Sequence, residues 1–167
     1  MNVSASGLPP FQRFLDAERD VVWRFLVSAV GSAEADDCFQ ETFIAALRAY
    51  PRLRPGSNLR AWVLTIAQRK ALDAHRARAR RALPVPDPAS GDRSRASPSA
   101  HEQAFSHDMP LWDAVGALPA RQRSAVVLRY VADLPHRDIA TAIGCSEEAA
   151  RRSLHEGLVK LRKAVRT

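Results

Sequence analysis

The stretch AEADDCFQETFIAALRAY, residues 33–50, decides the fold of its half of the chain. Its apolar side chains recur mostly three or four residues apart, the period at which side chains line up along one side of a helix. These side chains are Phe39, Phe43, Ala46, Leu47 and Tyr50. The stretch is therefore predicted to form a helix that buries this stripe against neighbouring elements.

The opposite side of the same predicted helix is acidic. At about 100° per residue, Glu34, Asp37 and Glu41 fall together, away from the apolar stripe. The chain as a whole is basic, with 167 residues, a net charge of +7 and a pI of about 10.4. Carboxylates would oppose binding to a polyanion, so the charge of this face leaves its role an open question at this point.

Helical patterns also flank this stretch. Residues 11–29 carry apolar side chains at helical spacing, and a third helix is expected to begin at Ser57 or Asn58, because both residue types are good N-caps. The third helix presents four apolar side chains inward: Leu59, Trp62, Val63 and Ile66.

The composition changes at residue 84. The segment PVPDPASGDRSRASPSAHEQAFSH is rich in proline and serine and poor in large apolar side chains, which is typical of a flexible linker. The predicted fold class is therefore all-α, with two small helical domains joined by this linker. The predicted ranges are 9–83 for the first domain, 84–107 for the linker and 108–166 for the second domain.

The second domain contains the layout of a helix-turn-helix, LPHRDIATAIGCSEEAARRSLHEGLVKLRKAV. Gly144 can adopt the left-handed conformation that ends a helix, and Ser146 can cap the helix that follows. This second helix is expected to bury Ala150, Leu154, Leu158, Leu161 and Val165. Its other face shows side chains that can reach base edges and phosphates in a major groove: Arg151, Arg152 and His155. An amphipathic hairpin with a solvated charged face is the alternative, and the net basic charge favours DNA binding.

Basic residues are concentrated in one part of the chain. Between Pro51 and Leu83, nine residues are arginine or lysine and one is acidic. Arginine forks onto phosphate, so nucleic acid is the leading partner class and an anionic membrane surface the second.

Several other classes of function lack support in the sequence. Cys38 and Cys145 lie far apart and neither belongs to a C-x-x-C pair, which argues against a disulfide framework or a zinc cluster and fits a reducing cytoplasm. No catalytic residue, metal site or cofactor is predicted. We also expect no signal peptide and no membrane insertion.

Three segments together resemble the extracytoplasmic-function (ECF) group of bacterial RNA polymerase sigma factors. They are AEADDCFQETFIAALRAY, PRLRPGSNLRAWVLTIAQRKALDAHR and LPARQRSAVVLRYVADLPHRDIATAIGCSEEAARRSLHEGLVKLR. The most specific signal is the D-x-x-Q-E-T-F pattern, formed here by Asp37, Gln40, Glu41, Thr42 and Phe43. The resemblance covers nearly the whole chain apart from the linker. It implies a non-catalytic protein whose partners are core RNA polymerase and promoter DNA, with an anti-sigma factor as a further candidate partner.

The resemblance also implies roles for individual residues. The first domain would hold the clamp helices of the largest catalytic subunit of polymerase through Asp37, Gln40 and Glu41. It would also melt and read the minus-ten element through Arg54, Ser57, Asn58, Arg60, Arg69, Lys70 and Arg76. The second domain would touch the polymerase flap and read the minus-thirty-five element as duplex through Arg137, Ser146, Arg151, Arg152 and His155.

The recognition helix departs from the family pattern at Ala149, Ala150, Ser153 and Glu156. Ser153 stands where the family often has its second basic residue. Glu147 and Glu148 either favour the positive N-terminus of the helix or accept a hydrogen bond from a cytosine amine, and we favour the first interpretation.

Two other functions remain alternatives at this point. One is a stand-alone helix-turn-helix regulator, which would bind specific duplex DNA without polymerase, usually as a dimer. The other is a mimic that only sequesters an anti-sigma factor through its acidic face. The mimic ranks last because the basic segments are intact.

Overall fold

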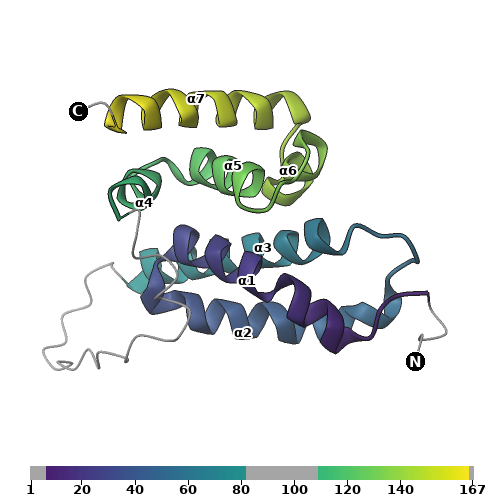
Figure 1. The fold of residues 1–167 in the computed structure, drawn as a ribbon. Helices are drawn as coiled ribbons and strands as arrows, with labels where there is room; N and C mark the ends of the chain where they lie inside the picture. Colours follow the sequence, from purple (N-terminus) through teal and green to yellow (C-terminus); the bar gives the residue numbers. More distant parts are fainter. Residues whose placement is uncertain (1–6, 82–108, 166–167) are drawn as a thin grey trace, which may run out of the picture.

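The computed structural model describes residues 7–81 and 109–165, which form two stacked layers of helices (Figure 1). No strand occurs in these two ranges, so the predicted all-α class is confirmed. The predicted linker, 84–107, lies outside the described residues. One layer contains α1 (Phe11–Val30), α2 (Ser32–Ala49), the short 3-10 helix η1 (Tyr50–Arg52) and α3 (Leu59–Arg81). The other contains α4 (Met109–Gly116), α5 (Ala120–Tyr130), α6 (His136–Ile143) and α7 (Glu147–Val165).

An aromatic cluster holds the first layer together. The ring centroid of Phe14 lies 5.3 Å from that of Tyr50 and 5.8 Å from that of Trp62. The Tyr50 hydroxyl donates to the carbonyl of Pro9 at 2.7 Å, which satisfies the polar end of a buried ring. Burial also raises the pKa of Tyr50. Trp62 was predicted to belong to the core, and it packs against the cluster while remaining half-buried.

The start of α3 resolves the choice between two predicted caps. The side-chain oxygen of Asn58 accepts the Ala61 amide at 3.1 Å, whereas the Ser57 hydroxyl donates to the Arg54 carbonyl at 2.7 Å. Asn58 is therefore the N-cap of α3, and Ser57 closes the turn before it.

The buried stripe of α2 differs from the prediction at Leu47, whose side chain is 55% exposed. Phe43, Ala46 and Tyr50 are buried as expected, and Phe39 is half-buried. The buried line instead follows small residues that let α2 approach both α1 and α3: Ala35, Cys38, Thr42 and Ala46. Leu47 is rotated by about 100° from Ala46 and so faces away from this line.

The helix-turn-helix forms where the sequence predicts it. Gly144 is left-handed, at φ 67° and ψ 48°, and the next amide, Cys145 N, bonds to the Ala140 carbonyl at 3.0 Å. The Ser146 hydroxyl accepts the Ala149 amide at 3.2 Å and caps α7. The prediction that Val165 is buried is wrong, since it is 65% exposed. It is the last residue of α7 and lies one turn beyond the last buried position on that helix.

A glycine inside α7 sets how closely this helix packs on α5. A Cβ at Gly157 would lie 2.9 Å from a methyl of Val126 and 3.4 Å from the Gln122 carbonyl. Glycine in a helix interior costs about 1 kcal/mol relative to alanine. The close approach of the two helices explains why it is used here.

Candidate functional site

The acidic face predicted for α2 is exposed. Asp37, Gln40 and Glu41 are exposed to solvent, and the buried Cys38 lies beside the acidic side chains on the way to the packed side of α2. This face of α2 and the side chains of the second half of α3 border a groove of about 350 Å³. Burial, with Glu41, Glu34 and Asp37 nearby, raises the pKa of the Cys38 thiol, as a local negative potential would.

The groove contains one carboxylate oxygen without a hydrogen-bond partner in the described residues, and one ion pair between α2 and α3. The Oε2 atom of Glu34 is buried and has no hydrogen-bond partner within the described ranges. The Glu41 carboxylate pairs with the Lys70 ammonium of α3 at 3.1 Å. Because Lys70 was assigned to the minus-ten element and Glu41 to polymerase, the structure brings two predicted sites into contact.

The residues predicted to read the minus-ten element form two groups. Arg54, Arg69 and Arg76 are exposed, and Arg76 is 3.6 Å from Asp73 on its own helix. Arg60, by contrast, is held by the Glu18 carboxylate of α1 at 2.8 Å, and Glu18 is only 13% exposed. Arg60 therefore fixes the start of α3 to α1 in this structure.

A line of residues on α3 combines an aromatic ring with basic groups. Trp62, Arg69 and Arg76 follow one another at intervals of seven residues, which places them on one side of the helix. The line begins beside the loop that carries Arg54, Ser57 and Asn58. It offers a half-buried ring and exposed guanidinium groups along one path.

The predicted recognition face lies on the outer side of α7. Arg151, Arg152 and His155 are exposed, as are Arg137 on α6 and Ser146 in the turn. Figure 1 shows α7 on the far side of α5 and α6 from the first layer, so this face looks away from α1 to α3.

The acidic residues beside this face have partners in the chain. Glu147 accepts a hydrogen bond from Arg151, and Glu148 lies 3.6 Å from Arg152. Both glutamates lie in the first turn of α7, where negative charge is favourable. Glu156 is exposed and accepts from Gln122 of α5 at 2.8 Å, so it is tied to the neighbouring helix at the edge of α7.

Ser153, at the family's second basic position, is only 8% exposed. A basic residue there would enter the packed side of α7. The neighbouring basic side chain, Arg152, is exposed.

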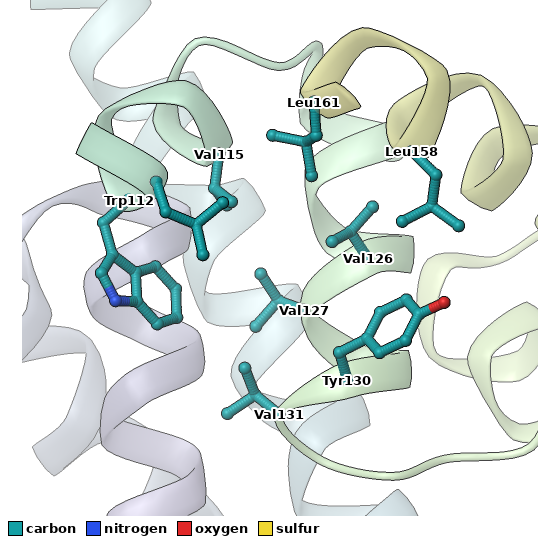
Figure 2. Close-up of a pocket in the computed structure, with 9 residues that line it drawn as sticks. Trp112, Val115, Val126, Val127, Tyr130, Val131, Leu158 and Leu161 are labelled. Carbon is teal, nitrogen blue, oxygen red and sulfur yellow. The ribbon is translucent and has the colours of Figure 1, made fainter. Parts of the chain in front are cut away.

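An apolar groove in the second layer was missed by the sequence reasoning. It encloses about 340 Å³ between α4, α5 and α7, and Figure 2 shows the side chains that face it. Tyr130 at its edge is 64% exposed and Leu111 is 41% exposed. The sequence signal for this groove is the run AVVLRYV, which places apolar side chains on several sides of α5. A single neighbouring helix could not cover all of them.

The sequence reasoning also missed a set of contacts between the two layers. The Asn58 amide donates to the Asp138 carboxylate of α6 at 2.9 Å, and the Ser124 hydroxyl of α5 donates to Gln68 of α3 at 3.0 Å. The Arg123 guanidinium donates to carbonyls at the end of α1, on Ser28 at 3.2 Å and Ala29 at 3.4 Å. No periodic signal could reveal contacts between residues so far apart in sequence.

Neither a metal-binding cluster nor a membrane-spanning helix is found in the part of the chain that the structure describes. No group of three or more His, Cys, Asp or Glu side chains in residues 7–81 and 109–165 is placed to hold a metal ion. Among the helices that the structure describes, none combines the length and apolarity needed to cross a membrane.

Two families of domain match the chain. Residues 14–81 match sigma-70 region 2, and residues 108–161 match sigma-70 region 4. The first range includes most of α1 and all of α2 and α3, and the second includes α4 to α6 and most of α7.

Characterised relatives match across both domains. The ECF RNA polymerase sigma factor SigD of Mycobacterium tuberculosis is 32% identical over 161 residues, covering 90% of this chain and 74% of the relative. The RNA polymerase sigma factor CarQ of Myxococcus xanthus is 32% identical over 171 residues, covering 91% of this chain and 93% of the relative.

Solved structures share the fold at lower identity. The sigma factor RpoE of Bartonella quintana, solved in complex with the anti-sigma factor NepR, gives a TM-score of 0.74 at 21% identity, covering 94% of this chain and 97% of that one. CnrH in complex with the cytosolic domain of CnrY gives 0.63 at 19% identity, with coverages of 93% and 86%. With both domain matches and relatives of this similarity, the chain belongs to the sigma-70 family, in its ECF group of RNA polymerase sigma factors.

Proposed function

We propose that this sigma factor divides its work among three surfaces. The acidic face of α2 binds core RNA polymerase, the loop before α3 and the outer side of α3 open and hold the minus-ten element, and α7 reads the minus-thirty-five element. We assign the first two tasks to a domain of residues 9–83 and the third to a domain of residues 108–166. The observation that carries this proposal is the separation of charge within one domain, acidic on α2 and basic along α3.

The acidic face suits a basic partner helix. Asp37 and Glu41 lie one turn apart, and the enclosed oxygen of Glu34 would gain a donor from an arginine of the partner. An arginine that reaches Glu41 would compete with Lys70 for the carboxylate. Because the Glu41 side chain is 62% exposed, exchanging this partner costs little.

The loop and α3 suit melted DNA. Extruding a base costs a few kcal/mol of stacking, which a pocket and phosphate contacts must offset. The Asn58 side chain offers amide donors at the N-terminus of α3, and Arg69 and Arg76 lie further along the helix as phosphate contacts. A strand that follows this path would leave its partner strand free for the polymerase.

The second domain suits duplex DNA and an apolar helix. The partners of Arg151 and Arg152 are exposed carboxylates on their own helix, and such pairs exchange readily for phosphate or base edges. The apolar groove between α4, α5 and α7 (Figure 2) has the dimensions of a site for one or two large side chains. We assign it to the polymerase flap.

Three further parts of the proposal follow from the family. The chain acts in the cytoplasm, where its polymerase is found, and it supplies no catalysis of its own. We also propose that an anti-sigma factor regulates it, since the structurally similar RpoE of Bartonella quintana was solved in complex with the anti-sigma factor NepR.

Reconstitution tests this function directly. Purified core polymerase plus the chain should initiate at a promoter that core polymerase alone ignores. A chain that gives sequence-specific shifts on duplex DNA as a dimer, and that fails to associate with core polymerase, would be a stand-alone regulator instead.

A further inference from the structure

A cavity of about 480 Å³ lies where the end of α1, the start of α2 and the last part of α3 meet α4 and α5 (Figure 1). None of the residues to which we assign polymerase or promoter binding lines this cavity. Only Trp112 is shared with the apolar groove of the second domain. The cavity is therefore separate from the three surfaces of the proposed function, and its chemistry can be considered by itself.

Basic side chains from three helices line this cavity. They are Arg24 of α1, His75 and Arg78 of α3, and Arg123 of α5. Among the described residues that line it, Asp113 of α4 is the one carboxylate. Three arginines against one aspartate give the cavity a positive potential, which attracts an anion.

Two of these basic side chains meet at the end of α1. The Ala29 carbonyl lies 2.9 Å from His75 Nε2 and accepts from Arg123 Nη1 at 3.4 Å. The same Arg123 nitrogen donates to the Ser28 carbonyl at 3.2 Å. The last carbonyls of an α-helix lack partners within the helix, so they are available to hold both side chains. These two groups are therefore in place before a ligand arrives, which lowers the entropy cost of binding it.

Arg24 and Arg78 complete the basic wall of the cavity. Both are exposed, and neither is paired with a carboxylate in residues 7–81 and 109–165. Arg78 lies three residues after His75, so the two side chains share one side of α3. A guanidinium group donates two parallel hydrogen bonds to a phosphate, which makes arginine well suited to this anion. Arginines from different helices can thus hold different phosphates of one ligand.

The start of α2 adds backbone donors to the same cavity. Helix α2 begins at Ser32, and no side chain of the described residues caps it. Ser32 and the preceding Gly31 both line the cavity. The first amides of a helix have no partners within the helix and attract anions. The uncapped start of α2 therefore supports the arginines in favouring a negatively charged ligand.

The remaining wall indicates what else the ligand carries. It is apolar, with Val27, Val30 and Trp112 among its side chains. The volume falls in the range of sites for small organic molecules, and a single phosphate would leave most of it empty. Burial lowers the pKa of Arg123, and the attraction between a partly buried charge and an anion is stronger than at an exposed surface. Several phosphates with an organic group attached would fit both walls.

We propose that this cavity binds a small molecule with two or more phosphates, held by Arg24, Arg78 and Arg123 and by the start of α2. Nucleoside di- and triphosphates share this chemistry with inorganic polyphosphate. This inference does not rest on the proposed function. Because the ligand contacts helices of both domains, it stabilises the whole chain. At a ligand concentration of about a hundred times Kd, Tm should rise by about 5–10 °C.

Isothermal titration calorimetry of the full-length chain at fixed ionic strength tests the site. The probes are ATP, GTP, sodium tripolyphosphate and inorganic phosphate, and differential scanning fluorimetry follows Tm with each. The variant Arg24→Ala with Arg78→Ala removes two exposed arginines of the cavity. The matched control, Arg48→Ala with Arg80→Ala, removes the same charge from two exposed arginines outside it. Arg80 is on the same helix as Arg78 but about 200° around it.

The wild-type chain should bind tripolyphosphate or a nucleotide at one site per chain. Inorganic phosphate should bind at least about tenfold more weakly, because it cannot reach arginines on two helices at once. Each lost contact to a phosphate weakens binding about tenfold or more, so the cavity variant should bind about a hundredfold more weakly. The control should keep the wild-type Kd. Tighter binding of ATP or GTP than of tripolyphosphate would assign the apolar wall to the base, and equal binding would identify the phosphates alone as the ligand.

Three results would overturn the site. They are no saturation by any probe up to about 1 mM, an equal loss of affinity in the control variant, and inorganic phosphate binding as tightly as tripolyphosphate. The outcome is also independent of polymerase. A chain that binds core polymerase but none of the probes loses this site alone, whereas a chain that binds a probe but not core polymerase loses the proposed function alone.

Discussion

Reversing the charge of the acidic face on α2 should remove most of the affinity for core polymerase and leave the fold intact. The perturbation is the double substitution Asp37→Lys with Glu41→Lys. Both side chains are exposed, and the one ion pair that the substitution breaks joins Glu41, 62% exposed, to Lys70, 30% exposed, at 3.1 Å. Exposed pairs are worth about 0–1 kcal/mol, so Tm should fall by only about 2–4 °C.

The loss of affinity follows from the number of contacts. A hydrogen bond to a charged group contributes about 1.5–3 kcal/mol, so two lost contacts amount to at least about 3 kcal/mol. Every 1.4 kcal/mol is about tenfold in Kd, and the double variant should bind core polymerase about a hundredfold more weakly. Fluorescence titration of labelled chain with core polymerase measures this, and circular dichroism checks the fold.

Asp36→Lys provides the matched control. Asp36 is exposed and adjacent to Asp37, but it lies about 100° around α2. If Asp36→Lys reduces the affinity for core polymerase by as much as each of the two substitutions in the double variant does on average, the effect comes from net charge alone. The assignment of polymerase binding to the Asp37 and Glu41 side of the helix would then be refuted.

Three further predictions concern the second domain and the cysteines. Gly157→Ala should lower the free energy of unfolding by about 1–2 kcal/mol, because the added methyl meets Val126 at 2.9 Å; an unchanged denaturant midpoint would show that α5 and α7 can separate freely. Arg152→Ala should weaken promoter duplex binding by about tenfold with an unchanged Tm, as measured by gel shift at fixed salt, and equal losses on unrelated duplexes would indicate a phosphate contact only. Cys38, which is buried and has a raised thiol pKa, should react with iodoacetamide at pH 8 far more slowly than the partly exposed Cys145, and equal rates by mass spectrometry would contradict the packing of α2.

The helices and their ends were predictable because local chemistry determines them. Gly144 and Ser146 act within a few residues of their own positions, and the structure confirms both. The stripe on α2 was predicted with one error. Leu47 is as apolar as its neighbours, but the buried line is set by where α1 and α3 approach, and small residues allow the closer approach there.

The placement of side chains across helices was less accessible to sequence reasoning. Val165 continues the spacing of Leu161, yet it extends past the packed elements and is exposed. Glu156 looked like a charge beside the DNA face, whereas Gln122 draws it toward α5. Both outcomes depend on the reach of a neighbouring helix, which periodicity within one helix does not contain.

Contacts between the domains were the least predictable part. The Asn58–Asp138 pair joins residues 80 positions apart. In the sequence alone, Asn58 indicates an ordinary helix cap and Asp138 an ordinary solvated acid. Their significance appears only when the loop before α3 and the helix-turn-helix are seen together.

Run-off transcription with purified components tests the central claim most directly. Core RNA polymerase is mixed with genomic DNA fragments, with and without the chain, and the transcripts are sequenced. The account predicts a set of transcripts that depends on the chain and whose start sites share paired upstream elements spaced for two domains. The absence of any chain-dependent transcript, together with no association between the chain and core polymerase, would contradict it.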